Sequence, residues 1–389
     1  MNVSQEWSQQ FDSLSSKLTI TADLLGNSYI LEPNTDPATS ISFTLAKYAT
    51  NSKLIWQQNI DEAYTIASLA IATNLNQNVY ISGIADKQLT LTCLTPSGKQ
   101  IWQTSEEVAS QTAVPKTFLW PQTSGELYMG LYSEPNQIML QRYTQNGERL
   151  ESHSWSLGES DELWALTADS TGNLYAAGVI TSGKEQNTAS LSDTWIAKYT
   201  TDGSQLWREY WGASTWDVAT CMTCDIQGNI YVAGTTEGQL GEDLARGGAD
   251  VWLAKYNENG EEQWIEQFGS LATDQLFQIA CDYAGNIYLS GQTAGQIAGI
   301  PVEEGVGAWI AKYRPHSDLE WIHQWQPNIL SVADGLSCDA LGSVYWAGRS
   351  FFSTEYDQSM GYLKKFRDDP KTMADLRQVM HDQTVGQNP

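Results

Sequence analysis

The sequence is short of basic residues: 21 lysines and arginines face 46 aspartates and glutamates, so the formal net charge is −25. A chain of this sign repels the phosphates of nucleic acids and the headgroups of anionic lipids. We therefore expect neither nucleic acid nor a membrane surface among its partners.

Long apolar runs are also missing. No stretch approaches the roughly 18 consecutive apolar residues that a membrane-spanning helix needs. The first residues, MNVSQEWSQQFDSLSS, lack the basic and apolar segments of a secretory signal. We expect a cytoplasmic protein without membrane insertion, which still allows release as part of a larger particle.

Catalytic motifs are scarce as well. The chain has four histidines in different sequence contexts, and it contains no GxSxG, P-loop, HExxH or zinc-binding spacing. We predict a protein that is not an enzyme and that needs no cofactor. A carboxylate pair assembled by the fold stays open, because the chain is rich in acids.

The five cysteines do not indicate disulfides. Cys224, Cys281 and Cys338 recur at one constant interval, each directly before an aspartate. Equivalent positions of successive repeats lie in different structural units, so these thiols are too far apart to bridge. Cys221 and Cys224 spell CxxC, but in an extended run they point to opposite faces, which disfavours a metal or redox pair.

What the sequence does contain is a repeat. DSTGNLYAAG at 169–178, DIQGNIYVAG at 225–234 and DYAGNIYLSG at 282–291 are nearly the same ten residues. The tyrosine of this motif occurs seven times at nearly regular intervals, at Tyr29, Tyr80, Tyr128, Tyr175, Tyr231, Tyr288 and Tyr345. Six residues earlier stands a polar residue that can close a tight turn: Asp23, Asn74, Gln122, Asp169, Asp225, Asp282 or Asp339.

A second marker follows each tyrosine. Its sharpest copies are WIAKY at 195–199, WLAKY at 252–256 and WIAKY at 309–313. Eight residues past the end of this marker a tryptophan recurs, at Trp56, Trp102, Trp207, Trp264 and Trp321. The third repeat has Glu151 at that place and the last has Ala374.

Each unit therefore holds four short strand-like runs separated by turns, which is typical of a propeller blade. We predict an all-β, seven-bladed β-propeller over residues 1–369, followed by a helical tail at 370–389. The last repeat lacks its fourth strand, and EWSQQF at 6–11 matches QWIEQF at 263–268. The N-terminus is thus expected to supply the outermost strand of the last blade and to close the ring.

The repeated strings resemble the SBBP-type β-propeller repeat of bacterial proteins. The resemblance rests on D-x-x-G-N-[IL]-Y followed by W-[IL]-A-K-Y, covers residues 5–366, and is sharpest in the fourth to sixth repeats. It implies a propeller fold and no single activity.

The longest connections between second and third strands belong to three adjacent blades, at 178–193, 234–250 and 291–307. Long loops on a rigid scaffold often carry binding. The last of them contains an apolar group that suits a protein partner, or that folds back on the loop itself: Ile297, Ile300, Pro301 and Val302.

Two further sets are candidates for ligand binding. Asp161, Asp217 and Asp274 each stand at the same separation before the tyrosine of their repeat, where they could gather around Ca²⁺ or, as we favour, cap their own strands. Trp216, with Trp155, Trp164 and Trp211, could stack on sugars as in a lectin or, as we favour, pack between blades.

The tail carries an apolar stripe at helical spacing: Met373, Leu376, Val379 and Met380. It could dock into a partner groove or lie on its own propeller. Taken together, these features predict an interaction scaffold, an accessory subunit of a larger assembly such as a phage-tail-like or contractile injection particle. The alternative is a carbohydrate-binding lectin.

Overall fold

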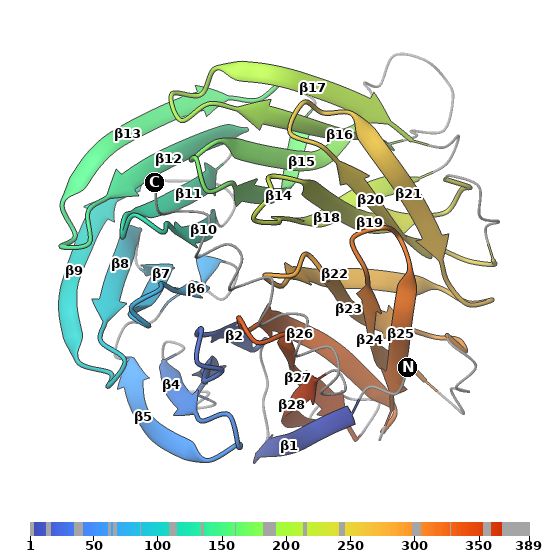
Figure 1. Ribbon diagram of the computed structural model, residues 1–389, viewed down its shortest axis with the longest axis horizontal. Coiled ribbons are helices and arrows are strands. Elements are labelled where there is room, and N and C mark those ends of the chain that lie inside the picture. The colour runs from blue at the N-terminus through green and yellow to red at the C-terminus, as the bar shows by residue number, and fades with distance from the viewer. Residues whose placement is uncertain are drawn as a thin grey trace, which may run out of the picture.

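A computed structural model of the chain describes residues 4–12, 17–34, 42–60, 64, 68–85, 87–108, 115–133, 136–159, 161–181, 192–212, 216–240, 246–297, 305–326, 328–352 and 359–367. Within these ranges the regular elements are strands, and they form seven four-stranded antiparallel sheets around one axis (Figure 1). The predicted all-β seven-bladed propeller is confirmed. The helical tail and its boundary at 369 lie outside the described residues.

Six blades follow the chain from the axis outward. They are β2 (Thr19–Ala22), β3 (Ser28–Pro33), β4 (Phe43–Tyr48) and β5 (Leu54–Ile60); β6 (Ala70–Thr73), β7 (Val79–Ala85), β8 (Gln88–Leu94) and β9 (Gln100–Glu107); β10 (Lys116–Pro121), β11 (Leu127–Ser133), β12 (Gln137–Tyr143) and β13 (Arg149–Ser156); β14 (Asp161–Ala168), β15 (Leu174–Thr181), β16 (Ser192–Tyr199) and β17 (Gln205–Trp211); β18 (Asp217–Cys224), β19 (Ile230–Thr236), β20 (Asp250–Tyr256) and β21 (Glu262–Phe268); and β22 (Asp274–Cys281), β23 (Ile287–Thr293), β24 (Gly307–Tyr313) and β25 (Leu319–Trp325).

The seventh blade joins the two ends of the propeller. It contains β26 (Leu330–Cys338), β27 (Ser343–Phe351) and β28 (Ser359–Arg367), and its outermost strand is β1 (Ser4–Asp12). β1 runs antiparallel to β28, from the pair Ser4 and Arg367 to the pair Asp12 and Met360. Without β1, the edge of β28 would present unpaired backbone groups.

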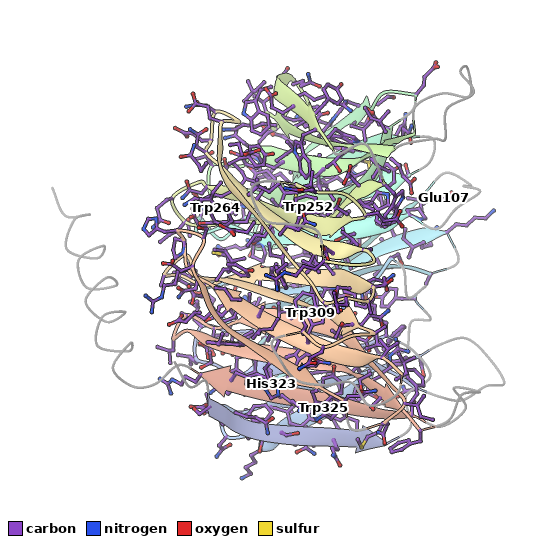
Figure 2. All side chains as sticks on the ribbon, turned by 90° about the vertical axis from the view of Figure 1, so that its right-hand side faces the viewer. Glu107, Trp252, Trp264, Trp309, His323 and Trp325 are labelled. Carbon is purple, nitrogen blue, oxygen red and sulfur yellow. The ribbon has the colours of Figure 1, made fainter. Side chains whose placement is uncertain are left out.

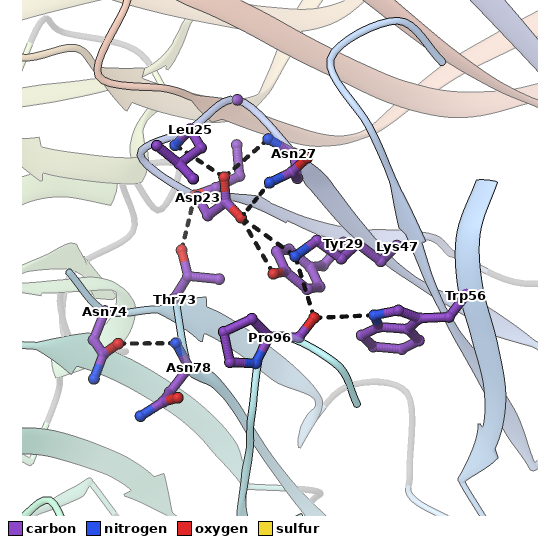
Figure 3. Close-up of polar contacts among 12 residues, drawn as sticks. Asp23, Leu25, Asn27, Tyr29, Lys47, Trp56, Thr73, Asn74, Asn78 and Pro96 are labelled. Carbon is purple, nitrogen blue, oxygen red and sulfur yellow. Dashed lines mark hydrogen bonds and ion pairs between the residues drawn. The ribbon is translucent and has the colours of Figure 1, made fainter. Parts of the chain in front are cut away.

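The repeated ten residues build the turn between the first two strands of a blade. In the first blade Asp23 Oδ1 accepts hydrogen bonds from the backbone N–H groups of Leu25 and Asn27, at 3.0 and 2.9 Å (Figure 3). Its Oδ2 accepts from Asn27 Nδ2 at 2.8 Å and from the Tyr29 hydroxyl at 3.2 Å. The same set recurs around Asp169, Asp225 and Asp282. The motif is therefore a structural device that fixes a tight turn to the buried tyrosine.

The lysine of the second marker and the tryptophan eight residues past the end of that marker join one blade to the next. Trp56 Nε1 and Lys47 Nζ both donate to the carbonyl oxygen of Pro96, in the outer turn of the following blade, at 3.0 and 3.2 Å (Figure 3). The pairs Lys198–Trp207, Lys255–Trp264 and Lys365–Trp7 do the same at the carbonyls of Glu258, Pro315 and Thr50. Each of these lysines also lies over its blade's marker tyrosine ring.

The joint between the second and third blades lacks the lysine, because Cys93 stands in its place and Trp102 donates to the Gln145 carbonyl at 2.8 Å. The joint between the third and fourth blades departs further from the pattern. Glu151 replaces the tryptophan and pairs with Arg142, with 2.5 Å between Oε1 and the guanidinium nitrogen. Trp155 covers the next blade's Gly203 instead, and its indole nitrogen has no hydrogen-bond partner in the part of the chain that the structure describes. This joint is closed by ring packing without the shared carbonyl.

The core consists of layers between adjacent blades. The tryptophans that begin the second marker, Trp195, Trp252 and Trp309, are fully buried, and Figure 2 places the last two within the stacked sheets.

The five cysteines are free thiols, and burial raises the pKa of Cys221 to about 12. No described segment forms a helix that is long and apolar enough to cross a membrane.

We expect deletion of residues 1–12 to destabilise the whole ring, because it removes the partner of β28 and the contacts of Trp7 and Phe11. Loss of either aromatic side chain alone typically costs about 3–5 kcal/mol. Trp7→Phe, which loses the bond to Thr50 and part of the indole's packing, should cost less than the loss of the whole side chain, about 1–2 kcal/mol. Urea unfolding and size-exclusion chromatography measure both. A deletion variant as stable and as monodisperse as the full chain would contradict a closing role for β1.

Candidate functional site

Two kinds of connection gather on one face of the disc. The links from the last strand of one blade to the first strand of the next lie there, together with the links from second to third strands. We call this side the loop face and the side with the short turns the turn face. The structure fixes the two kinds of link to each other: Asp274 N donates to Ala249 O at 2.7 Å, and Val306 N donates to Ile329 O at 3.0 Å.

The long loops of the fifth and sixth blades have matching stems. Leu240 N donates to Gln267 Oε1 at 2.7 Å, and at the equivalent position of the next blade Ile297 N donates to Gln324 Oε1 at 3.2 Å. The same glutamines donate from Nε2 to the carbonyls of Gly238 and Gly295, respectively. Each loop therefore leaves the blade from a stem that a glutamine of the outermost strand holds.

The structure corrects the expectation that Ile297 belongs to a partner-binding surface. Ile297 is 2% exposed and packs with Trp309 and Leu276 in the core, so it anchors the loop and offers no surface to a partner. The burial follows from the bond that Gln324 makes with its backbone, a contact that the local sequence does not reveal. Ile300, Pro301 and Val302 lie outside the described residues, as do Met373, Leu376, Val379 and Met380.

The three aspartates that could gather around Ca²⁺ are each used within their own blade. Asp161 pairs with Arg208 at 2.7 Å and accepts from Gly158 N at 2.7 Å. Asp217 is fully buried and accepts from the Thr236 hydroxyl. Asp274 is also fully buried; it accepts from Ser270 N at 2.5 Å, and burial raises its pKa above the usual value. Among the described residues, no three His, Cys, Asp or Glu side chains are grouped to hold a metal ion.

The four tryptophans that could stack on a sugar divide into two pairs. Trp155 packs on Tyr199, and Trp211 meets Trp252 edge-on with 4.4 Å between ring centroids. Trp216 and Trp164 instead keep 43% and 36% of their surface exposed. These two rings are the ones of the set that a ligand could reach.

Both exposed rings line a cavity of about 1110 Å³ at the inner ends of the blades. Its walls come chiefly from β10, β14, β18 and β22, and the aromatic rings in them are Phe118, Trp164, Trp216 and Phe277. Threonines and glutamines add polar groups to the same walls. A cavity of this size, mainly apolar with a few polar groups, has the general character of a small-molecule site.

Two lysines of this cavity were not among the residues that the sequence indicated. Lys116 is the first residue of β10, and Lys17 stands just before β2. Around Lys17 and Lys116 the sequence departs too far from the repeat to show which residue faces the axis. The first strands of the later blades also contain a bulge, for example between Leu163 and Ala165, which shifts their register relative to β10.

Comparison with known proteins indicates no activity for the chain. No family model matches the chain, and no curated protein matches it. Among solved structures, the crystal structure of BBS1N in complex with ARL6DN is similar with a TM-score of 0.49 and 8% sequence identity. The match covers 93% of this chain and 96% of that one. At this level the likeness carries no information about what this chain binds.

We expect Gln324→Met to loosen the stem of the sixth blade's loop. The substitution leaves Ile297 N–H and the Gly295 carbonyl without their side-chain partner, which should cost about 1–3 kcal/mol. Urea unfolding gives the change in stability, and hydrogen exchange at the Ile297 amide shows whether the loss is local. Gln263→Met, at an exposed position of β21, is the matched control and should change stability by less than about 0.5 kcal/mol. Equal behaviour of the two variants would exclude the anchoring role.

Proposed function

We propose that the protein is a non-enzymatic interaction scaffold, an accessory subunit of a larger protein assembly, which binds a protein partner through the loop face of its fourth to sixth blades. A β-propeller fold commonly serves protein interactions, and a rigid disc with long loops on one side is suited to that role. One specific version is a subunit of a phage-tail-like or contractile injection particle.

The observation that carries the proposal is a set of exposed apolar side chains on the loop face. Leu271, in the link between the fifth and sixth blades, is 90% exposed. Ile329 and Phe352 of the seventh blade and Trp216 of the fifth are also exposed on this side. Solvent-exposed apolar groups beside polar loops are typical of a surface that a protein partner covers.

The exposed apolar residues are also held in place. An added Cβ at Gly247 would lie 2.5 Å from Leu271 O, and one at Gly305 would lie 1.9 Å from Ile329 O. The loop stems therefore pack directly against the links that carry Leu271 and Ile329. A surface fixed in this way loses little conformational entropy when a partner binds.

Ring closure by the first strand belongs to the same proposal. We regard β1 as the element that makes the propeller one rigid body, because Trp7 and Lys365 share the carbonyl of Thr50 just as the equivalent pairs share theirs elsewhere. A closed ring keeps the loops of several blades at fixed distances from each other.

Substitutions on the two faces provide the test. Leu271→Glu combined with Phe352→Glu should abolish capture of the partner from native lysate, because two charges would be buried at the contact. Leu25→Glu combined with Leu75→Glu places the same charges at exposed turn-face positions and should leave capture unchanged. Capture is quantified by mass spectrometry of affinity-purified material. Wild-type chain that recovers only itself would count against the scaffold, and equal loss in both double variants would count against the loop face.

A second candidate function is a carbohydrate-binding lectin. It is favoured by the exposed rings of Trp164 and Trp216 beside the central cavity, because such rings can stack on sugars.

For the lectin we expect Trp216→Ala to abolish binding on a glycan array, while Trp211→Phe, a change in a packed ring, leaves it intact. An array on which the wild-type protein binds no glycan removes this candidate.

A further inference from the structure

The central cavity carries a charge that contrasts with the rest of the molecule. The chain as a whole has a net charge of −25, yet the charged side chains among the described residues lining the cavity are Lys17, Lys116 and Glu237. The two lysines come from the first and third blades, whereas Glu237 follows β19 in the fifth. One sector of the cavity is therefore cationic inside an acidic protein.

Within the described part of the chain, neither ammonium group forms an ion pair with an aspartate or a glutamate. Lys116 Nζ contacts the carbonyl of Leu163 at 3.5 Å and lies 5.5 Å from the centroid of the Trp164 ring. Its hydrogen-bonding capacity is thus only partly used, since an ammonium group has three donors.

Asp334, the acid whose charge acts on Lys17, already forms an ion pair with Arg349. Asp334 accepts from Arg349 Nε at 2.6 Å and from a second guanidinium nitrogen at 2.9 Å, and it also accepts from Leu18 N at 3.3 Å. Asp334 still raises the pKa of Lys17, and Arg349 lowers that pKa with a smaller effect. The Asp334–Arg349 pair therefore balances the charge of Lys17 only in part.

The surroundings disfavour the charged form of both lysines. Enclosure by protein lowers the pKa of Lys17 although its side chain is accessible to water; Asp334 raises that pKa, and Arg349 lowers it with a smaller effect. Burial likewise lowers the pKa of Lys116, against a raising effect of Glu162, and the charge of Lys17 lowers it again. An anion placed between cations that repel each other relieves this cost.

The other residues of the cavity wall favour a ligand with an aromatic ring. Trp164 and Trp216 offer exposed rings, and Phe118 and Phe277 add apolar surface to the same space. Rings of this kind stack with planar ligands. Glu237, at the opposite sector, disfavours a second anionic group there.

We propose that the central cavity is a binding site for a small organic anion with an aromatic body, whose anionic group pairs with Lys17 and Lys116 while its ring packs on Trp164 and Trp216. The cavity differs from the part of the proposed partner surface that Leu271 and Phe352 form, because these two residues do not line it; Trp216 borders both.

Fluorescence titration with 8-anilinonaphthalene-1-sulfonate tests the site, with N-phenyl-1-naphthylamine as the neutral probe of the same ring system. The folded protein should bind the sulfonate at one saturable site. The double substitution Lys17→Gln and Lys116→Gln should weaken sulfonate binding about tenfold or more and change binding of the neutral probe less than about twofold. Lys53→Gln with Lys99→Gln, in outer turns, removes the same charge and should change neither.

Two further measurements keep the proposal falsifiable if the double variant does not fold. Lys116→Arg retains the charge and should retain the preference for the sulfonate. For the wild-type chain, raising the salt concentration should weaken binding of the sulfonate and leave that of the neutral probe unchanged. Equal affinity of the two probes, equal loss in the outer-turn control, or no saturable binding of the sulfonate would overturn the site. None of these results depends on whether a protein partner is captured.

Discussion

At four of its joints the propeller depends on one repeated contact, in which a single backbone carbonyl in the outer turn of one blade accepts hydrogen bonds from a tryptophan and a lysine of the preceding blade. Pro96, Glu258, Pro315 and Thr50 supply these carbonyls. The lysine is held because it lies over a buried tyrosine whose hydroxyl is fixed by the turn aspartate. The turn, the core ring and the joint between blades are therefore one connected unit wherever the contact occurs.

This arrangement separates structure from function in space. The repeated contacts lie toward the turn face and between the sheets, where the seven blades are most alike. The loop face is where the blades differ, in loop length, in exposed apolar groups such as Leu271, and in the cations of the cavity. Because the repeated contacts that hold the ring lie outside these loops, the loop face is the part that can vary and acquire a partner.

The excess of acidic residues describes the charge of the outer surface and not that of the cavity at the axis. Outside, a charge of −25 disfavours polyanions and keeps like chains apart. At the axis, Arg349 pairs with Asp334, and in the described part of the chain neither Lys17 nor Lys116 forms an ion pair with a carboxylate. Overall charge therefore does not describe the chemistry of the cavity, because short-range pairing decides which charges remain available.

The sequence by itself determined the fold: seven tyrosines at regular spacing, with a turn-forming residue six positions earlier, define four-stranded blades through purely local geometry. It also indicated that Asp217 and Asp274 could be strand caps, since equivalent places in a repeat have equivalent local partners. Only the tertiary structure decided that Ile297 is an anchor, because its burial depends on Gln324 in another strand. Likewise, only the fold brings Lys17 and Lys116 together from blades far apart in the chain, and the bulges of the inner strands conceal that alignment from any linear comparison of the repeats.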